Sequence, residues 1–312
     1  MYLITIVKKI FKRLYYIIYF NRRKAFQRFL TFYSINKNPK FFRPGSKPYL
    51  SGDTLRRMCD HIFDETSTLD PKKIKENDFI FLKTDLVSIF FENYHIDIDN
   101  KYNLISTNSD TEIGKELTSY ADEKINAWFT QNLLIKSQKN IFPLAVGIEN
   151  KRYLTNGITN NFRIQYSEDD KKLKMLASFN VGTNYEERKK LMDVASKISI
   201  IEIRNFNNHK EYIKSLSKYK FNLCPHGNGI DTHRIWETLL VNSIPVLLNT
   251  SFAQNFKEIG VPMLLVNKWE DLLDLSETEL NNFYTEKKKV GDFRKYSTFS
   301  FWKNYIELKS SK

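Results

Sequence analysis

The residues best suited to chemistry lie in Lys220–Asn249, where an apolar strand, a glycine-containing loop and an amphipathic helix follow one another. Phe221–Cys224 is typical of a strand, and Pro225 ends it. The loop that follows contains Gly227 and Gly229, which lack the side chain that would keep a ligand away from the backbone. In an open α/β sheet, the next helix would direct its free N–H groups at an anion beyond the end of the strand.

The opening of that helix carries side chains that suit a nucleotide. Asp231 or Thr232 can cap it. Arg234 lies in the first turn and can hold a diphosphate through two parallel hydrogen bonds. Glu237 lies one turn further on the same face, where it can accept hydrogen bonds from ribose hydroxyls. The alternative interpretation is a local Arg234–Glu237 ion pair on an exposed helix face.

The pattern F-x-L-C-P-x-G-x-G-x-D-x-x-R-x-W-E-x-L-x-x-x-x-I-P-V, which spans Phe221–Val246, resembles the nucleotide-sugar-binding motif of exostosin-type glycosyltransferases and related bacterial GT-B enzymes. The resemblance implies that the C-terminal half binds a nucleotide diphosphate, with Arg234 on the phosphates and Glu237 on the ribose. The donor-binding residues expected from the motif are His226, Gly227, Asn228, Gly229, Asp231, Thr232, Arg234 and Glu237. Asn242 stands where such families usually have glycine, and we expect it in a left-handed turn.

Glycosyl transfer to a hydroxyl needs a general base near the acceptor unless configuration is retained by another path. Asp110 follows the predicted strand Tyr102–Thr107 and is our first choice as the catalytic residue. Asp53 and Asp85 are alternatives, and each of the three could instead be a helix cap or turn former. Asn132 and Glu149 could line the cleft, although no motif singles them out.

The elements that must position these residues alternate along the chain. Strands are expected at 78–83, 102–107, 141–146, 173–180, 198–204, 219–224, 244–248 and 263–266. Helices are expected at 51–65, 85–94, 113–120, 184–196, 210–217 and 232–241, with Ser51 or Asp53 capping the first. This alternation predicts an α/β protein, GT-B-like, with two Rossmann-like domains facing a cleft.

We divide the chain into three parts. Residues 1–44 form a basic amphipathic N-terminal segment, 45–165 an acceptor-side α/β domain, and 166–312 a nucleotide-sugar-binding α/β domain. The polar stretch 150–170 connects the two domains or lies on the surface.

The net charge of +13 is concentrated at the N-terminus. Twelve Lys and Arg residues and no acid occur in residues 1–52, which leaves 37 basic and 36 acidic residues in the rest. A nucleic-acid-binding surface is therefore not expected. The apolar strip along Ile6–Ile18 beside Lys and Arg suits a helix on an anionic membrane through residues 1–30, or one packed on the protein's own body. No spanning segment or secretory signal is expected there, because charges interrupt the apolar stretches.

The remaining features limit the chemistry. Cys59 and Cys224 do not form a disulfide framework, so a cytoplasmic setting on the inner face of the cell membrane is expected. Cys224, His226 and His233 do not have a zinc-site spacing, so neither a metal nor a cofactor is expected. The sequence therefore predicts a metal-independent transferase that uses a nucleotide diphosphate sugar and a glycan or lipid-linked acceptor, of surface polysaccharide or lipopolysaccharide type. The alternative is a non-catalytic nucleotide- or glycan-binding protein of the same fold.

Overall fold

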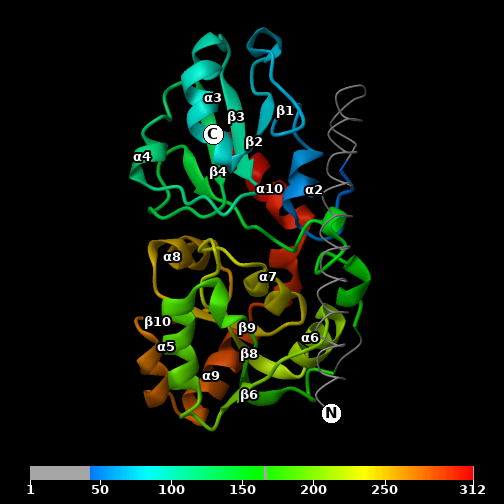
Figure 1. Ribbon diagram of the computed structural model, residues 1–312, viewed down its shortest axis with the longest axis vertical. Helices are drawn as coiled ribbons and strands as arrows, with labels where there is room; N and C mark the ends of the chain where they lie inside the picture. Colours follow the sequence, from blue (N-terminus) through cyan, green and yellow to red (C-terminus); the bar gives the residue numbers. More distant parts are fainter. Residues whose placement is uncertain (1–42, 165–166, 312) are drawn as a thin grey trace, which may run out of the picture.

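The computed structural model describes residues 43–164 and 167–311 of the chain. Within them two parallel five-stranded sheets, each accompanied by helices, lie one above the other (Figure 1). This arrangement confirms the α/β, GT-B-like prediction. The predicted amphipathic helix in residues 1–44 falls almost wholly outside the described residues.

The first sheet has its strands side by side in chain order. They are β1 (His61–Phe63), β2 (Phe79–Lys83), β3 (Tyr102–Thr107), β4 (Ile125–Thr130) and β5 (Ile141–Pro143). Short helices accompany them: α2 (Gly52–Arg56), α3 (Val87–Asn93) and α4 (Lys115–Thr118). Because all the strands are parallel, their carboxyl ends meet at one edge, which faces the second sheet.

The second sheet has a reversal in its strand order. Its strands are β6 (Lys172–Ala177), β7 (Ile201–Ile203), β8 (Tyr219–Leu223), β9 (Ile244–Leu248) and β10 (Leu264–Val266), and they lie in the order β10-β9-β8-β6-β7. The helices are α5 (Tyr185–Ala195), α6 (His209–Leu216), α7 (His233–Leu240), α8 (Ser251–Glu258) and α9 (Glu277–Lys288). The order reverses between β6 and β8, and ligands of such sheets bind outside the strand ends at that point.

The final helix, α10 (Phe299–Ser310), returns to the first sheet (Figure 1). Trp302 and Ile306 are completely buried in a core that also contains Ala127 and Phe129 of β4. The ring of Tyr305 packs edge-on against Phe129, with ring centres 6.2 Å apart. Although we placed residues 166–312 in one domain, this helix packs on both, because the Trp302 ring also lies 5.8 Å from the Trp236 ring of α7.

Local sequence explains where several elements begin and end. Ser51 accepts a hydrogen bond from the Thr54 N–H, which confirms it as the cap of α2. Asn242 has φ of 56°, so the expected left-handed turn after α7 is confirmed. The predicted helix 51–65 is wrong beyond Arg56, because β1 occupies His61–Phe63.

Strand β4 was not predicted. Five of its six residues are buried, so Ile125–Thr130 lacks the alternation that marks a half-exposed strand. Predicted strand 141–146 is shorter, since β5 ends at Pro143 and the chain then turns toward the cleft. The long loop that follows contains two short 3₁₀ helices, η5 (Lys151–Tyr153) and η6 (Thr159–Phe162).

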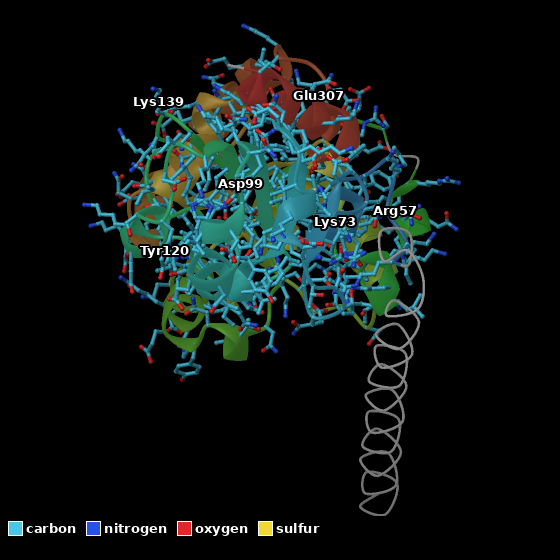
Figure 2. The ribbon with its side chains drawn as sticks, turned by 90° about the horizontal axis from the view of Figure 1, so that it is seen from above. Arg57, Lys73, Asp99, Tyr120, Lys139 and Glu307 are labelled. Carbon is cyan, nitrogen blue, oxygen red and sulfur yellow. The ribbon has the colours of Figure 1, made fainter. Side chains whose placement is uncertain are left out.

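Charged side chains of both signs surround the first domain, as Lys73, Asp99 and Glu307 show in the view from above (Figure 2). Among the described residues, no helix combines the length and apolar character that crossing a bilayer requires.

Candidate functional site

A cavity of about 1100 Å³ lies between the carboxyl ends of the two sheets. It is large enough for a ligand of nucleotide-sugar size. Side chains from both domains line it, and its C-terminal wall includes Ser178 after β6 and the loop after β8, at the reversal in strand order. The predicted site residues on its wall are Asp110, Gly227, Asn228, Gly229, Asp231, Thr232, Arg234 and Glu237. Their roles remain predictions.

Two arginines converge on this wall. Arg234 Nε donates to the Ser178 carbonyl oxygen at 3.1 Å. Arg188 of α5 donates from Nε to the His226 carbonyl and from Nη1 to the Asn180 carbonyl, both at 2.7 Å. Both guanidinium groups also lie over the Phe179 ring. Neither forms an ion pair with a carboxylate anywhere in residues 43–164 or 167–311.

The positive charges at this wall affect the pKa of Arg188. Burial, together with the nearby charge of Arg234, lowers the pKa of Arg188 to about 10. An anion between the two groups would relieve their repulsion. Gly227 makes room here, since a Cβ on it would lie 3.4 Å from Arg188 Nη2.

Sequence reasoning missed Arg188. A signal was available, because Arg188 lies in the first turn of α5, the helix that follows β6. Arg234 lies in the first turn of α7, which follows the neighbouring strand β8 in the same way. A search for an arginine in the first turn of every helix that follows a strand would have found both residues.

Glu237 is buried but ionised. His209 Nε2 lies 2.9 Å from Glu237 Oε1. Burial alone would raise the pKa of Glu237, but the hydrogen bond from His209 and nearby positive charge, including that of Arg234, lower it overall. Arg234 and Glu237 do not form the local ion pair that was the alternative interpretation, so both side chains serve the cavity wall.

The glycine loop is built differently from our expectation. His226 does not line the cavity: its Nδ1 lies 2.9 Å from Glu187 Oε2, and its carbonyl holds Arg188. The missing side chain of Gly229 accommodates the other domain, because a Cβ there would lie 2.9 Å from Asn132 Nδ2. Gly229 therefore serves close domain packing as well as the cavity.

Neither predicted capping residue caps α7 with its side chain. Thr232 occupies the N-cap position, but its Oγ1 is buried and has no hydrogen-bond partner in the described chain. Asp231 accepts from the Val146 N–H at 2.7 Å and from Trp236 Nε1 at 2.8 Å, which joins the two domains.

Asp110 is exposed and lines both the main cavity and a second one of about 610 Å³ beside it, on the N-terminal side. Asp85 also lines the second cavity, where Lys83 Nζ lies 2.8 Å away and Thr111 Oγ1 donates to it at 2.9 Å. Glu149 is occupied by the backbone N–H groups of Asn156 and Gly157. Asn132 joins the domains, since its Oδ1 accepts from the Asp231 N–H at 2.9 Å.

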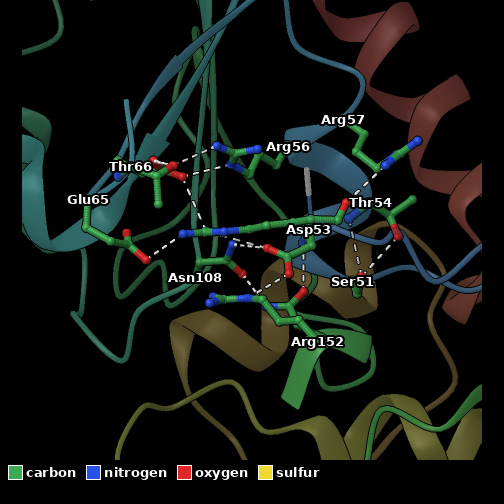
Figure 3. Close-up of polar contacts among 12 residues, drawn as sticks. Ser51, Asp53, Thr54, Arg56, Arg57, Glu65, Thr66, Asn108 and Arg152 are labelled. Carbon is green, nitrogen blue, oxygen red and sulfur yellow. Dashed lines mark hydrogen bonds and ion pairs between the residues drawn. The ribbon is translucent and has the colours of Figure 1, made fainter. Parts of the chain in front are cut away.

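Asp53 belongs to a buried ionic network behind these cavities (Figure 3). Arg152 Nε lies 2.8 Å from its Oδ2, and Asn108 Nδ2 donates to its Oδ1 at 3.1 Å. Arg56 and Arg43 both approach Asp64, at 2.8 and 3.2 Å. Asp53 is completely buried and already paired, so it is not available as a base.

No cluster of three or more potential metal-binding side chains occurs within the part of the chain that the structure describes. Cys224 is a buried thiol at a strand end, and burial raises its pKa to about 12. Trp128, Trp269 and Trp302 all belong to the core.

The chain resembles several solved glycosyltransferase structures at low identity. A structure described as OtsA without ligand is 12% identical, with a TM-score of 0.45, over 76% of this chain and 73% of that one. An E. coli trehalose-6-phosphate structure with UDP-2-fluoro glucose is 10% identical, with a TM-score of 0.44, over 77% and 74%. The pneumococcal O-GlcNAc transferase GtfA with UDP and GlcNAc is 12% identical, with a TM-score of 0.34, over 78% and 59%. No curated protein sequence matched the chain.

A family model supplies the stronger evidence. The model described as the RXYLT1 C-terminal domain matches residues 161–307, just under half of the chain, and this range contains Arg188, His209 and the whole motif Phe221–Val246. Residues 161–307 thus resemble the RXYLT1 C-terminal domain, and the predicted resemblance to exostosin-type GT-B glycosyltransferases is confirmed.

Proposed function

We propose that this protein transfers a sugar from a nucleoside diphosphate donor to a hydroxyl group of a glycan or lipid-linked acceptor. The observation that carries the proposal is the pair Arg188 and Arg234, two guanidinium groups on a cavity wall that form no ion pair with a carboxylate of the described residues. Such a pair suits a diphosphate, which both carries negative charge and develops more when it leaves the sugar.

The donor site then follows from the residues around this pair. The diphosphate lies between Arg188 and Arg234, near the buried hydroxyl of Thr232 and the first N–H groups of α7. Glu237 receives the ribose hydroxyls one helical turn further on. Charge neutralisation by arginine is the basis for a metal-independent mechanism, in which the guanidinium groups stabilise the leaving diphosphate.

The acceptor side lies in the N-terminal domain. Asp110, exposed between the two cavities, takes the proton from the acceptor hydroxyl as it attacks the sugar. The second cavity offers Lys83, Asp85 and Ser109 as hydrogen-bonding groups of both kinds. This mixture suits the hydroxyl-rich surface of a sugar acceptor in surface polysaccharide or lipopolysaccharide synthesis.

We further propose that residues 1–30 hold the enzyme at the cytoplasmic face of the membrane, where lipid-linked acceptors are made. The support is the twelve positive and no negative charges of residues 1–52. Liposome co-sedimentation tests this: binding should rise with anionic lipid and weaken with salt. Equal sedimentation of a chain that starts at residue 45 would contradict it.

Nucleotide titration tests the donor site. Arg234→Ala should lose a charge-assisted hydrogen bond worth about 1.5–3 kcal/mol, which is a roughly ten- to hundredfold loss in affinity for a nucleoside diphosphate. Arg234→Lys should recover only part of the affinity, because an ammonium group cannot make the two-pronged contact. Glu237→Gln should weaken nucleotide binding but affect inorganic pyrophosphate little.

Thermal melting checks that each variant is folded, which we expect because Ile235, Trp236 and Leu239 still anchor α7 in the core. Wild-type affinity in a folded Arg234→Ala protein would contradict the proposed site. A turnover assay with nucleotide sugars then separates the enzyme from a non-catalytic binding protein.

A further inference from the structure

The imidazole of His209, the first residue of α6, holds one oxygen of Glu237. Its Nε2 lies 2.9 Å from Glu237 Oε1, and the side chains of His209 and Glu237 are only 7% and 6% exposed. Both line the main cavity.

The ring of His209 is fixed on every side. Asn161 Nδ2 donates to His209 Nδ1 at 3.2 Å. The Phe162 ring packs edge-on against the imidazole with centres 5.4 Å apart, and the Tyr212 ring lies at 6.0 Å. The backbone beneath it is fixed as well, because Asn208 caps α6 by accepting from the Glu211 N–H. The fixed imidazole of His209 can therefore hold the Glu237 carboxylate in one position.

This arrangement determines how Glu237 meets a ligand. An ionised carboxylate only accepts hydrogen bonds, so His209 Nε2 is the donor and Oε1 is occupied. No second protein partner of Glu237 is present in the described ranges, which leaves Oε2 to the cavity. A glutamate without such a contact would lose side-chain entropy on binding, whereas this one is already ordered.

We infer that His209 is a positioning residue, which fixes Glu237 so that its remaining oxygen receives the ribose hydroxyls of the nucleotide. The inference rests on the proposed function. Asn161 and His209 lie well before the motif Phe221–Val246, so the geometry of the motif glutamate is set by side chains outside it.

The test compares ligands that contain and lack the ribose hydroxyls. We would titrate wild type and His209→Phe with three ligands: the tightest binder among UDP, GDP, ADP and CDP, its 2′,3′-dideoxy analogue, and inorganic pyrophosphate. Phenylalanine keeps the ring packing but cannot donate. We expect His209→Phe to lose about tenfold in affinity for the ribonucleotide, with little loss for the other two ligands. His209→Gln, whose amide can donate near the Nε2 position, should recover part of the loss.

His95→Phe is the matched control. His95 is also buried, and its Nε2 lies 2.9 Å from Asp122 Oδ2, but it lines neither cavity. It should bind all three ligands like wild type.

Two outcomes would overturn the inference alone: wild-type ribonucleotide affinity in a folded His209→Phe protein, or an equal loss for all three ligands, which would indicate general distortion. If wild type binds none of the four nucleotides, the proposed function fails and this inference fails with it.

Discussion

The two sheet edges that face the cleft, each formed by the carboxyl ends of parallel strands, differ in how their charged side chains are paired. Behind the N-terminal edge, Asp53 and Asp64 are enclosed by arginines within 4 Å, and the charges neutralise one another (Figure 3). At the C-terminal edge, Arg188 and Arg234 are held by backbone carbonyls, which fix the guanidinium groups without cancelling their charge. The first arrangement supports a domain, whereas the second is prepared for a ligand.

Breaking the neutral network should give the largest effect. Asp64→Ala removes the buried carboxylate that Arg56 and Arg43 share, so we expect the free energy of unfolding to fall by about 3–5 kcal/mol. Urea unfolding measures it. A loss of less than about 1 kcal/mol would mean that the network does not support the fold.

Removing a positive charge from the C-terminal edge should reduce nucleotide affinity more than it reduces stability. Arg188→Ala should weaken nucleoside diphosphate binding by about 1.5–3 kcal/mol, while the free energy of unfolding falls less than in Asp64→Ala, because repulsion with Arg234 is relieved. Calorimetric titration and urea unfolding on the same samples give both values.

Lys190→Ala is the control for Arg188→Ala. Lys190 lies on the same helix but pairs with Glu270 on the outside, so nucleotide affinity should stay at the wild-type value. If the Arg188→Ala protein binds the nucleotide as tightly as the Lys190→Ala protein does, the proposal that the C-terminal edge is prepared for a ligand is wrong.

Asp231, where the two edges meet, should have a smaller effect, on the pH dependence of the free energy of unfolding. Burial raises the pKa of Asp231 to about 7, although hydrogen bonds from Trp236 and Val146 oppose the rise. The folded state therefore binds this proton more tightly than the unfolded state does. The stability that this provides is complete below the ordinary aspartate pKa and is lost as the pH rises toward 7.

We expect Asp231 to reduce the free energy of unfolding by up to about 1.4 kcal/mol per pH unit on rising from about pH 5 to pH 7. Asp231→Asn should remove this slope. The difference between the two pH curves, from urea unfolding, is the quantity to measure. Parallel curves would show that the Asp231 carboxyl ionises as easily in the folded protein as in the unfolded one.

The sequence predicted best what depends on local patterns. Strand Tyr102–Thr107 and helix α7 follow from apolar periodicity, and the left-handed Asn242 from the end of that helix. The short β1 was missed because the predicted helix 51–65 covered its residues. Strand β4 was missed because, with five of six residues buried, it carries no alternation.

The candidate site divides in the same way. Arg234 and Glu237 stand in one motif, and the sequence placed both on the cavity wall. His209, Asn161 and Asn132 reach the site from distant segments, and only the folded chain brings them there. Asp231, one of the two expected caps of α7, instead accepts a hydrogen bond from Val146 of the other domain, a contact that no local pattern shows.

The return of α10 to the first sheet has a consequence for how such proteins can be recombined. The last helix of the chain adds Tyr305 to the core beside β4, far from the rest of that domain in sequence, and packs Trp302 against Trp236 of α7. A chimera that joins the first 165 residues to the donor half of a relative would leave that core with foreign side chains. Grafts that also carry residues 299–310 of the parent should therefore fold, and grafts that cut only once should not.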